Sequence, residues 1–463
     1  MKRWVALGLV LLVALPATAQ ADTAKALADM TAKASGALAV IQYTVALETG
    51  PKMVAGQGVC ILNADKLGVF LTTALDAGMK TDTLKDFVII TPGVGGKQLK
   101  AKLLGVDPWT GLGFVQATEK NDWQVVQFAQ FSKLALGHEV MSIGLMMGDP
   151  ARPVYIGQGF VAAKLRVPGD LAYVTGGRLT GAGSPVFNAA GQAIGIVGQQ
   201  LFMGYQSPTA RGLMPIQLRG QEESAFFTPV EEFVHALASL PVDGKVARLP
   251  WMGINKFEVL SEKVAETLKL EAPAVRVDEV IPAQPGAKAG LTNGDVIIEV
   301  GGKPLEELAT PQLSVQNFVR NVMRMHPGQQ IKLKVISGRN TKDVTVILGE
   351  MPTRPNEAPR YFNKALGLLV REKVMLDEYL DKSESAMVPG LIVLGLLKGS
   401  PAAAADLKGG DVITNVNNQT VKTIATFKDI VEKSLTASQT APINFLVRRG
   451  PQAQVVTVKP TGN

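Results

Sequence analysis

The first half of the chain is built of short hydrophobic runs, each about as long as a β-strand. Glycine, aspartate, asparagine and lysine separate these runs, which cover residues 38–47, 59–63, 68–74, 86–92, 99–106 and 112–117. Regularly spaced short strands with such punctuation are typical of a β-sandwich or a β-barrel. Residues 228–240 differ, because Thr228, Pro229 and Glu231 have the order of a helix N-cap, first residue and capping-box partner. This stretch predicts an amphipathic helix after the strands.

The second half of the chain contains one pattern twice. Each copy opens on a glycine between two apolar residues, at Gly253 or Gly367, and reaches Gly-Asp-Val-Ile about 40 residues later, at 294–297 or 410–413. A helical stretch and a closing strand follow in each copy, at 312–325 and 331–336 in the first, and at 426–434 and 443–447 in the second.

The N-terminus has the pattern of a secretory signal. Lys2 and Arg3 precede the apolar run 4–15, and the small residues Ala19 and Ala21 provide a cleavage site. The apolar run is too short to span roughly 30 Å of hydrocarbon, which favours a cleaved signal over a membrane anchor. We therefore expect a chain exported to the periplasm or the extracellular space, with no integral membrane span after cleavage.

Composition narrows the function classes further. A chain of 463 residues with 46% hydrophobic and 19% charged residues is expected to fold into two to four domains. A net charge of +7 is a mild excess at this length, and without a dense basic run it does not predict nucleic-acid binding. Cys60 is the one cysteine, so neither an internal disulfide nor a cysteine zinc site is expected. We expect no cofactor and no metal.

The repeat resembles a PDZ domain of the bacterial, circularly permuted kind. The resemblance implies a groove in which a peptide adds as a strand, with its terminal carboxylate on backbone N–H groups of the glycine loop. The helix across the groove is apolar in both copies, so protein C-termini with an apolar last residue are the expected partners. The predicted peptide-binding residues are Met252, Gly253, Ile254, Val315, Phe318, Val319 and Val322 in the first copy, and Leu366, Gly367, Leu368, Phe427, Ile430 and Val431 in the second.

Three segments of the first half, residues 71–75, 107–112 and 180–185, resemble the catalytic corners of the HtrA/Deg family of trypsin-like serine proteases. The resemblance implies a mostly β fold, in which a trypsin-like double β-barrel domain precedes two α+β PDZ domains. It divides the chain into a signal peptide (1–21), a protease-type domain (22–243), a first PDZ domain (248–350), a linker (351–362) and a second PDZ domain (363–461).

Leu75, Gly111 and Ala182 stand where that family has its histidine, its aspartate and its nucleophilic serine. None of the three carries an atom that attacks a carbonyl or transfers a proton. We therefore expect no catalytic residues and no enzyme, but an exported HtrA-like pseudoprotease that holds polypeptides through its PDZ domains, as a scaffold, an adaptor or a chaperone.

Two alternatives remain open at this point. In the first alternative, the chain is an active serine endopeptidase with a non-standard site, for which Ser184 is the best alternative nucleophile. In the second alternative, the chain is a regulatory subunit that assembles with an active relative. The family commonly forms trimers, so assembly of the chain with itself is also expected.

Overall fold

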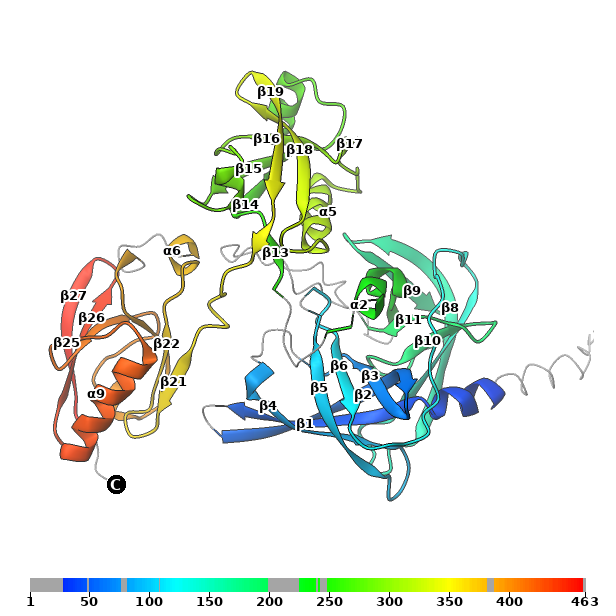
Figure 1. Cartoon of the computed structure of the whole chain (residues 1–463), viewed down its shortest axis with the longest axis horizontal. Coiled ribbons are helices and arrows are strands. Elements are labelled where there is room, and N and C mark those ends of the chain that lie inside the picture. Colours follow the sequence, from blue (N-terminus) through cyan, green and yellow to red (C-terminus); the bar gives the residue numbers. More distant parts are fainter. Residues whose placement is uncertain are drawn as a thin grey trace, which may run out of the picture.

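The computed structural model describes residues 28–47, 50–75, 81–107, 109–198, 225–238, 240–241, 248–380 and 387–460. Figure 1 shows two barrels side by side, a first repeat above them and a second repeat to one side. The predicted signal peptide, residues 1–21, lies outside the described residues. No helix in these ranges combines the length and the apolar character needed to cross a bilayer.

The first barrel closes from six antiparallel strands in the order β1-β2-β3-β6-β5-β4. Its interior holds the large apolar side chains of the predicted runs, among them Tyr43 and Phe70, which are almost fully buried. Cys60 lies in the same core, and burial raises the pKa of its thiol to about 12. The strands are β1 (Leu38–Leu47), β2 (Gly50–Ala64), β3 (Leu67–Thr72), β4 (Leu84–Ile90), β5 (Gln98–Val106) and β6 (Gly113–Ala117), with the short helix η1 (Thr81–Thr83) before β4.

The second barrel closes in the order β10-β11-β12-β9-β8-β7, so the prediction of a double β-barrel is confirmed. A separate apolar cluster, which includes Val161, Ile194 and Phe227, fills it. Its strands are β7 (Glu139–Leu145), β8 (Val154–Arg166), β9 (Asp170–Thr175), β10 (Pro185–Asn188), β11 (Ala193–Val197) and β12 (Phe226–Pro229).

The helix predicted at residues 228–240 is shorter than the pattern indicated. Thr228 lies in β12 and pairs with Ile196, and its hydroxyl donates to the carbonyl of Gly198 rather than capping a helix. A 3-10 turn, η4 (Val230–Glu232), and the short helix α2 (Val234–Ala238) follow. Pairing with the barrel therefore outweighs the local N-cap signal.

The first repeat is an open antiparallel sheet, in the order β14-β15-β16-β18-β19, with a long helix against it. The helix α5 (Pro311–Met323) begins at Thr310, whose hydroxyl accepts from the N–H of Leu313. The other elements are β13 (Pro250–Trp251), β14 (Ile254–Val259), α3 (Glu262–Thr267), β15 (Val275–Val280), α4 (Pro285–Lys288), β16 (Val296–Val300), β17 (Lys303–Pro304), β18 (Gln330–Ser337), β19 (Asn340–Ile347) and β20 (Gly349–Glu350).

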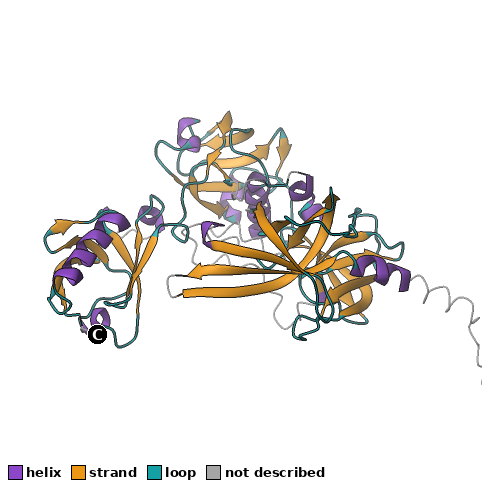
Figure 2. Ribbon diagram, turned by 60° about the horizontal axis from the view of Figure 1, so that its bottom comes forward, coloured by secondary structure: helices purple, strands orange, loops and turns teal. Residues whose placement is uncertain are grey.

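The second repeat has the same sheet order, with one strand added at its edge: the strand before the glycine loop, β21, pairs with β22, whereas β13 of the first repeat pairs with β20. Its sheet runs β21-β22-β23-β24-β26-β27, and Figure 2 shows α9 lying across these strands. The new strand begins at Arg360, inside the segment predicted as linker. The elements are β21 (Arg360–Asn363), β22 (Leu368–Glu372), α6 (Asp377–Leu380), β23 (Leu391–Leu396), α8 (Pro401–Ala404), β24 (Val412–Val416), β25 (Gln419–Thr420), α9 (Ile424–Ala437), β26 (Ile443–Arg449) and β27 (Gln452–Val458).

A buried ion pair joins the first repeat to the second barrel. The guanidinium of Arg320, on α5, contacts both carboxylate oxygens of Glu232 at 2.6 Å, and the side chains are 3% and 1% exposed. One of these oxygens also accepts the backbone N–H of Asp170. At the rim, Arg166 of β8 pairs with Glu306 at 3.1 Å. The helix predicted to line a peptide groove is thus fixed to the barrel domain.

Candidate functional site

The glycine loop of the first repeat has the backbone that a carboxylate needs. Gly253 has φ +75°, and a Cβ there would lie 2.4 Å from the Cβ of Gln284, so only glycine fits. In the described part of the chain, the N–H groups of Met252 and Gly253 have no hydrogen-bond acceptor. Two neighbouring free N–H groups form a small anion-binding nest.

The strand after this loop has a free edge. Within the described residues β14 pairs with β15 only, through contacts such as Ile254 with Val280. The opposite edge of β14 therefore keeps its main-chain donors and acceptors for an added strand.

The apolar residues predicted around this groove lie together, but as core side chains. Met252, Ile254 and the four helix residues are between 2% and 6% exposed. Phe318 packs edge-on against Phe257 of β14, with ring centroids 5.3 Å apart. The helix and the strand are therefore already in contact.

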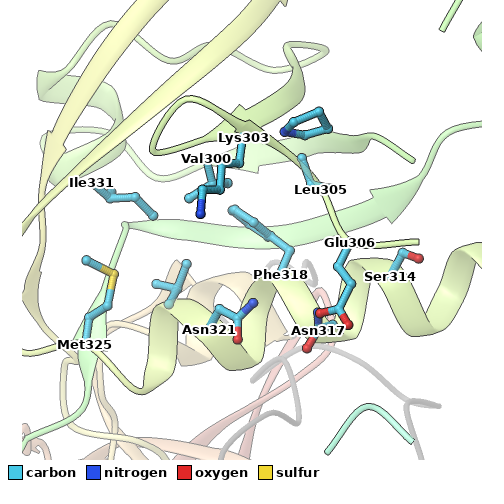
Figure 3. A pocket seen from close by; sticks show the side chains of 12 residues that line it. Val300, Lys303, Leu305, Glu306, Ser314, Asn317, Phe318, Asn321, Met325 and Ile331 are labelled. Atoms are coloured by element: carbon cyan, nitrogen blue, oxygen red, sulfur yellow. The ribbon is translucent and has the colours of Figure 1, made fainter. Parts of the chain in front are cut away.

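A pocket of about 240 Å³ opens on the first repeat between α5 and the β16–β17 hairpin (Figure 3). No residue of β14 lines it, so it is distinct from the strand edge. Phe318 points into it from α5, beneath Lys303 (Figure 3). The lining residues are Val300, Lys303, Pro304, Leu305, Glu306, Ser314, Asn317, Phe318, Asn321, Val322, Met325 and Ile331.

Two side chains from other parts of the chain join the apolar cluster of the first repeat. Trp109, from the loop between β5 and β6, and Leu376, from the second repeat, are 3% and 1% exposed in the cluster that contains Met252. Beside them the amide of Gln284 lies 3.8 Å from the sulfur of Met375. The sequence pattern carried no sign of these contacts, because both residues lie in irregular segments outside the first repeat.

The glycine loop of the second repeat is different, because its donors are already used. The N–H of Leu366 donates to the side chain of Asn363 at 3.0 Å, and that of Gly367 donates to the carbonyl of Lys364 at 3.3 Å. The predicted residues of this copy, Leu366, Gly367, Leu368, Phe427, Ile430 and Val431, are all buried.

The three segments that resemble catalytic corners meet between the two barrels. Leu75 is buried, and its side chain lies against Gly113, close to the turn at Gly111, which has φ +72°. From the second barrel, Gly183 approaches so closely that a Cβ there would lie 2.7 Å from the hydroxyl of Thr73. Ala182 is exposed. The frame of the site is therefore assembled around three residues, Leu75, Gly111 and Ala182, that carry no catalytic side-chain atoms.

The hydroxyl of Ser184 lies inside this frame rather than at its surface. Ser184 is fully buried, and its oxygen accepts from the side-chain amide of Gln57 at 3.0 Å. The oxygen of the same amide accepts the N–H of Leu145 at 2.7 Å. Gln57 belongs to the first barrel and Leu145 to the second, so Ser184 is part of a polar bridge between them.

A carboxylate and an imidazole come together near the second corner. His235 of α2 lies 3.6 Å from the carboxylate of Asp107, which also accepts the N–H and the hydroxyl of Thr110. Burial acts to raise the pKa of Asp107, but His235 and the hydrogen bonds from Thr110 outweigh it, so this pKa is lowered. The sequence pattern carried no sign of this pair, because the two residues lie far apart in the chain.

Comparison with known proteins gives the context of this geometry. Residues 56–196 match the family model of a trypsin-like peptidase domain, and residues 251–348 and 392–441 each match a model of a PDZ domain. A protein of Hahella chejuensis named "Probable periplasmic serine endoprotease DegP-like" is 30% identical over 383 residues, covering 78% of this chain and 72% of its own. A protein of the same name from Pseudomonas fulva is 29% identical over 374 residues, covering 78% and 71%.

A solved structure shares the fold. A variant of the HtrA-type protease AlgW, in a structure with a decapeptide, superposes with a TM-score of 0.53 at 21% identity, covering 72% of this chain and 99% of that one. This likeness supports the order of barrels and PDZ domain.

These comparisons correct the expectation that the chain is not an enzyme. The relatives that match it over most of its length are named as serine endoproteases, and the matched domain model is that of a peptidase. The expectation rested on three positions, whereas catalytic groups are recognised by their geometry and roles rather than by their place in a sequence.

Proposed function

Because the chain belongs to the family of DegP-like, HtrA-type serine endoproteases, we propose that it is an exported member that captures polypeptide C-termini at its first PDZ domain. The carboxylate binds the N–H groups of Met252 and Gly253, and the peptide adds as a strand to β14. The periplasm is the proposed location, as the names of the relatives state for them. The ligand's last residue is apolar, and the predicted signal peptide directs export.

The observation that carries this proposal is the pair of free N–H groups beside an unpaired strand edge. Together they supply both contacts that a C-terminal peptide makes with a PDZ groove. The first repeat has them, and in the second repeat the corresponding donors are used within the chain. We therefore propose the first loop and α5 as the peptide site of this chain.

Substituting Gly253→Ala is expected to weaken peptide binding by about tenfold or more, because the added Cβ meets Gln284 and deforms the nest. Fluorescence anisotropy with labelled peptides ending in leucine or valine measures this. Amidation of the peptide terminus is expected to weaken binding to a similar degree. Gly301→Ala is the matched control, since Gly301 also has positive φ but has nothing within 4 Å of its Cβ position. Equal affinity of the amidated peptide would contradict the proposal.

Endopeptidase activity is a second proposed function, and family membership is the observation that favours it. Cleavage by this chain has to use side chains other than Leu75, Gly111 and Ala182, because these lack the necessary atoms. Ser184 is a hydroxyl at the site, but its burial and its bond to Gln57 keep it from a substrate carbonyl in this conformation.

A fluorophosphonate probe on the folded mature chain is therefore expected to leave Ser184 unmodified. Peptide mapping by mass spectrometry measures this, with Ser184→Ala and a boiled sample as controls. Specific labelling at another serine would locate the nucleophile. Labelling of Ser184 that is lost on boiling would show that this loop opens in solution.

A further inference from the structure

We propose that the groove of the second PDZ domain is a strand-binding site with a resident ligand, the chain's own strand β21. The ligand class is an extended internal segment with an aromatic residue, added antiparallel to β22, rather than a free C-terminus. This inference concerns the second groove alone and does not depend on peptide capture by the first.

Pairing along the edge of β22 is the first support. Among the described residues, the strand after the glycine loop of the second repeat has two neighbours, β21 and β23, whereas its counterpart β14 has one. All four residues of β21 pair antiparallel with β22, from Arg360 with Arg371 to Asn363 with Leu368. The main-chain groups that would receive an added peptide therefore already have partners.

Side-chain contacts of β21 with the facing helix are the second support. Tyr361 packs edge-on against Phe427 of α9, with ring centroids 6.2 Å apart. Its hydroxyl donates to Glu432 on the same helix at 3.2 Å, and the ammonium of Lys428 lies 5.8 Å from its ring centroid. Phe427 is one of the residues predicted to line this groove. Tyr361 therefore occupies the place of a ligand side chain.

The glycine loop explains why the ligand is an internal segment. Asn363, the last residue of β21, accepts the N–H of Leu366 through its side chain, and Gly367 donates to Lys364. The loop donors that would bind a carboxylate are satisfied by the turn between β21 and β22. A competing ligand therefore needs the edge of β22 and the aromatic contact, and gains nothing from a free terminus.

Amide hydrogen exchange on the unmodified mature chain tests the pairing without any substitution. Both edges of β22 are paired, so its amides at 369–372 are expected to exchange slowly without alternation. In β14, the amides directed to the free edge are expected to exchange fast. Alternating fast exchange in β22 would overturn the proposal.

The ligand class is tested with a capped peptide that has the sequence of residues 356–364. Because β21 is tethered, it competes at millimolar effective concentration. Tyr361→Ala is therefore expected to bind the capped peptide about tenfold tighter than the unmodified chain. A peptide with alanine in place of its tyrosine should lose this binding.

Val455→Ala, at an exposed position of β27, is the matched control and should leave the affinity at the unmodified level. Circular dichroism establishes that each variant is folded. Equal affinity of Tyr361→Ala and Val455→Ala for the peptide would overturn the proposal, as would binding that requires a free C-terminus.

Discussion

Replacing Arg320 with methionine is expected to release the first PDZ domain from the second barrel. The substitution leaves the carboxylate of Glu232 buried without its cationic partner, and breaking a buried pair in this way costs about 3–5 kcal/mol. Within the described ranges, three other contacts with the barrels remain: the partly exposed pair of Arg166 with Glu306, the bond from Arg324 to the carbonyl of Glu231 at 3.0 Å, and the packing of Trp109. The release is therefore expected to be partial and largest around α5. Faster amide exchange in α5 and a larger radius of gyration by small-angle scattering would measure the release.

A second arginine of the same domain provides the control. Arg276 forms ion pairs with Glu258 and Asp278, but its side chain is 46% exposed. Arg276→Met is therefore expected to cost less than about 1 kcal/mol and to leave the domain docked. Combining Arg320→Met with Glu232→Leu should recover much of the loss, since replacing both partners removes the buried charge. Similar exchange in the Arg320 and Arg276 variants would contradict the assigned role of the pair.

This docking was not predictable from the sequence, although the domains themselves were. The barrel strands follow from short apolar runs, and the prediction of 38–47 coincides with β1. The two PDZ domains follow from a repeat, which the structure shows as two similar sheets. Such patterns report which face of an element is buried. They do not report which domain supplies the covering side chain, so nothing in the pattern marks Arg320 as an interdomain contact.

The positions of the two glycine loops followed from the sequence, whereas the hydrogen bonding of these loops did not. The sequence placed both glycine loops correctly at the start of a strand, because Gly253 and Gly367 need positive φ. It assigned residues 360–362 to a linker, because a four-residue strand carries too little pattern to be distinguished from extended chain. Which edge such a strand joins is decided by tertiary contacts such as that of Tyr361 with Phe427. The sequence therefore predicted a strand after the second glycine loop without showing that β21 pairs with it.

Replacing Gln57 with leucine is expected to destabilise the contact between the two barrels. The side chain is 5% exposed and serves both as acceptor for Leu145 and as donor to Ser184. Leucine has a similar volume but no polar atoms, so two buried groups lose a partner, at about 1–3 kcal/mol for each one left unsatisfied. Chemical unfolding measures the change through Trp123, which packs edge-on at 4.8 Å from Phe70 in the barrel core.

The partner residue shows whether the loss comes from the bridge itself. Adding Ser184→Ala to Gln57→Leu should recover part of the stability, because the double variant no longer buries a hydroxyl without its donor. Gln98→Leu, on the exposed face of β5, is the matched control and is expected to change stability by no more than about 0.5 kcal/mol.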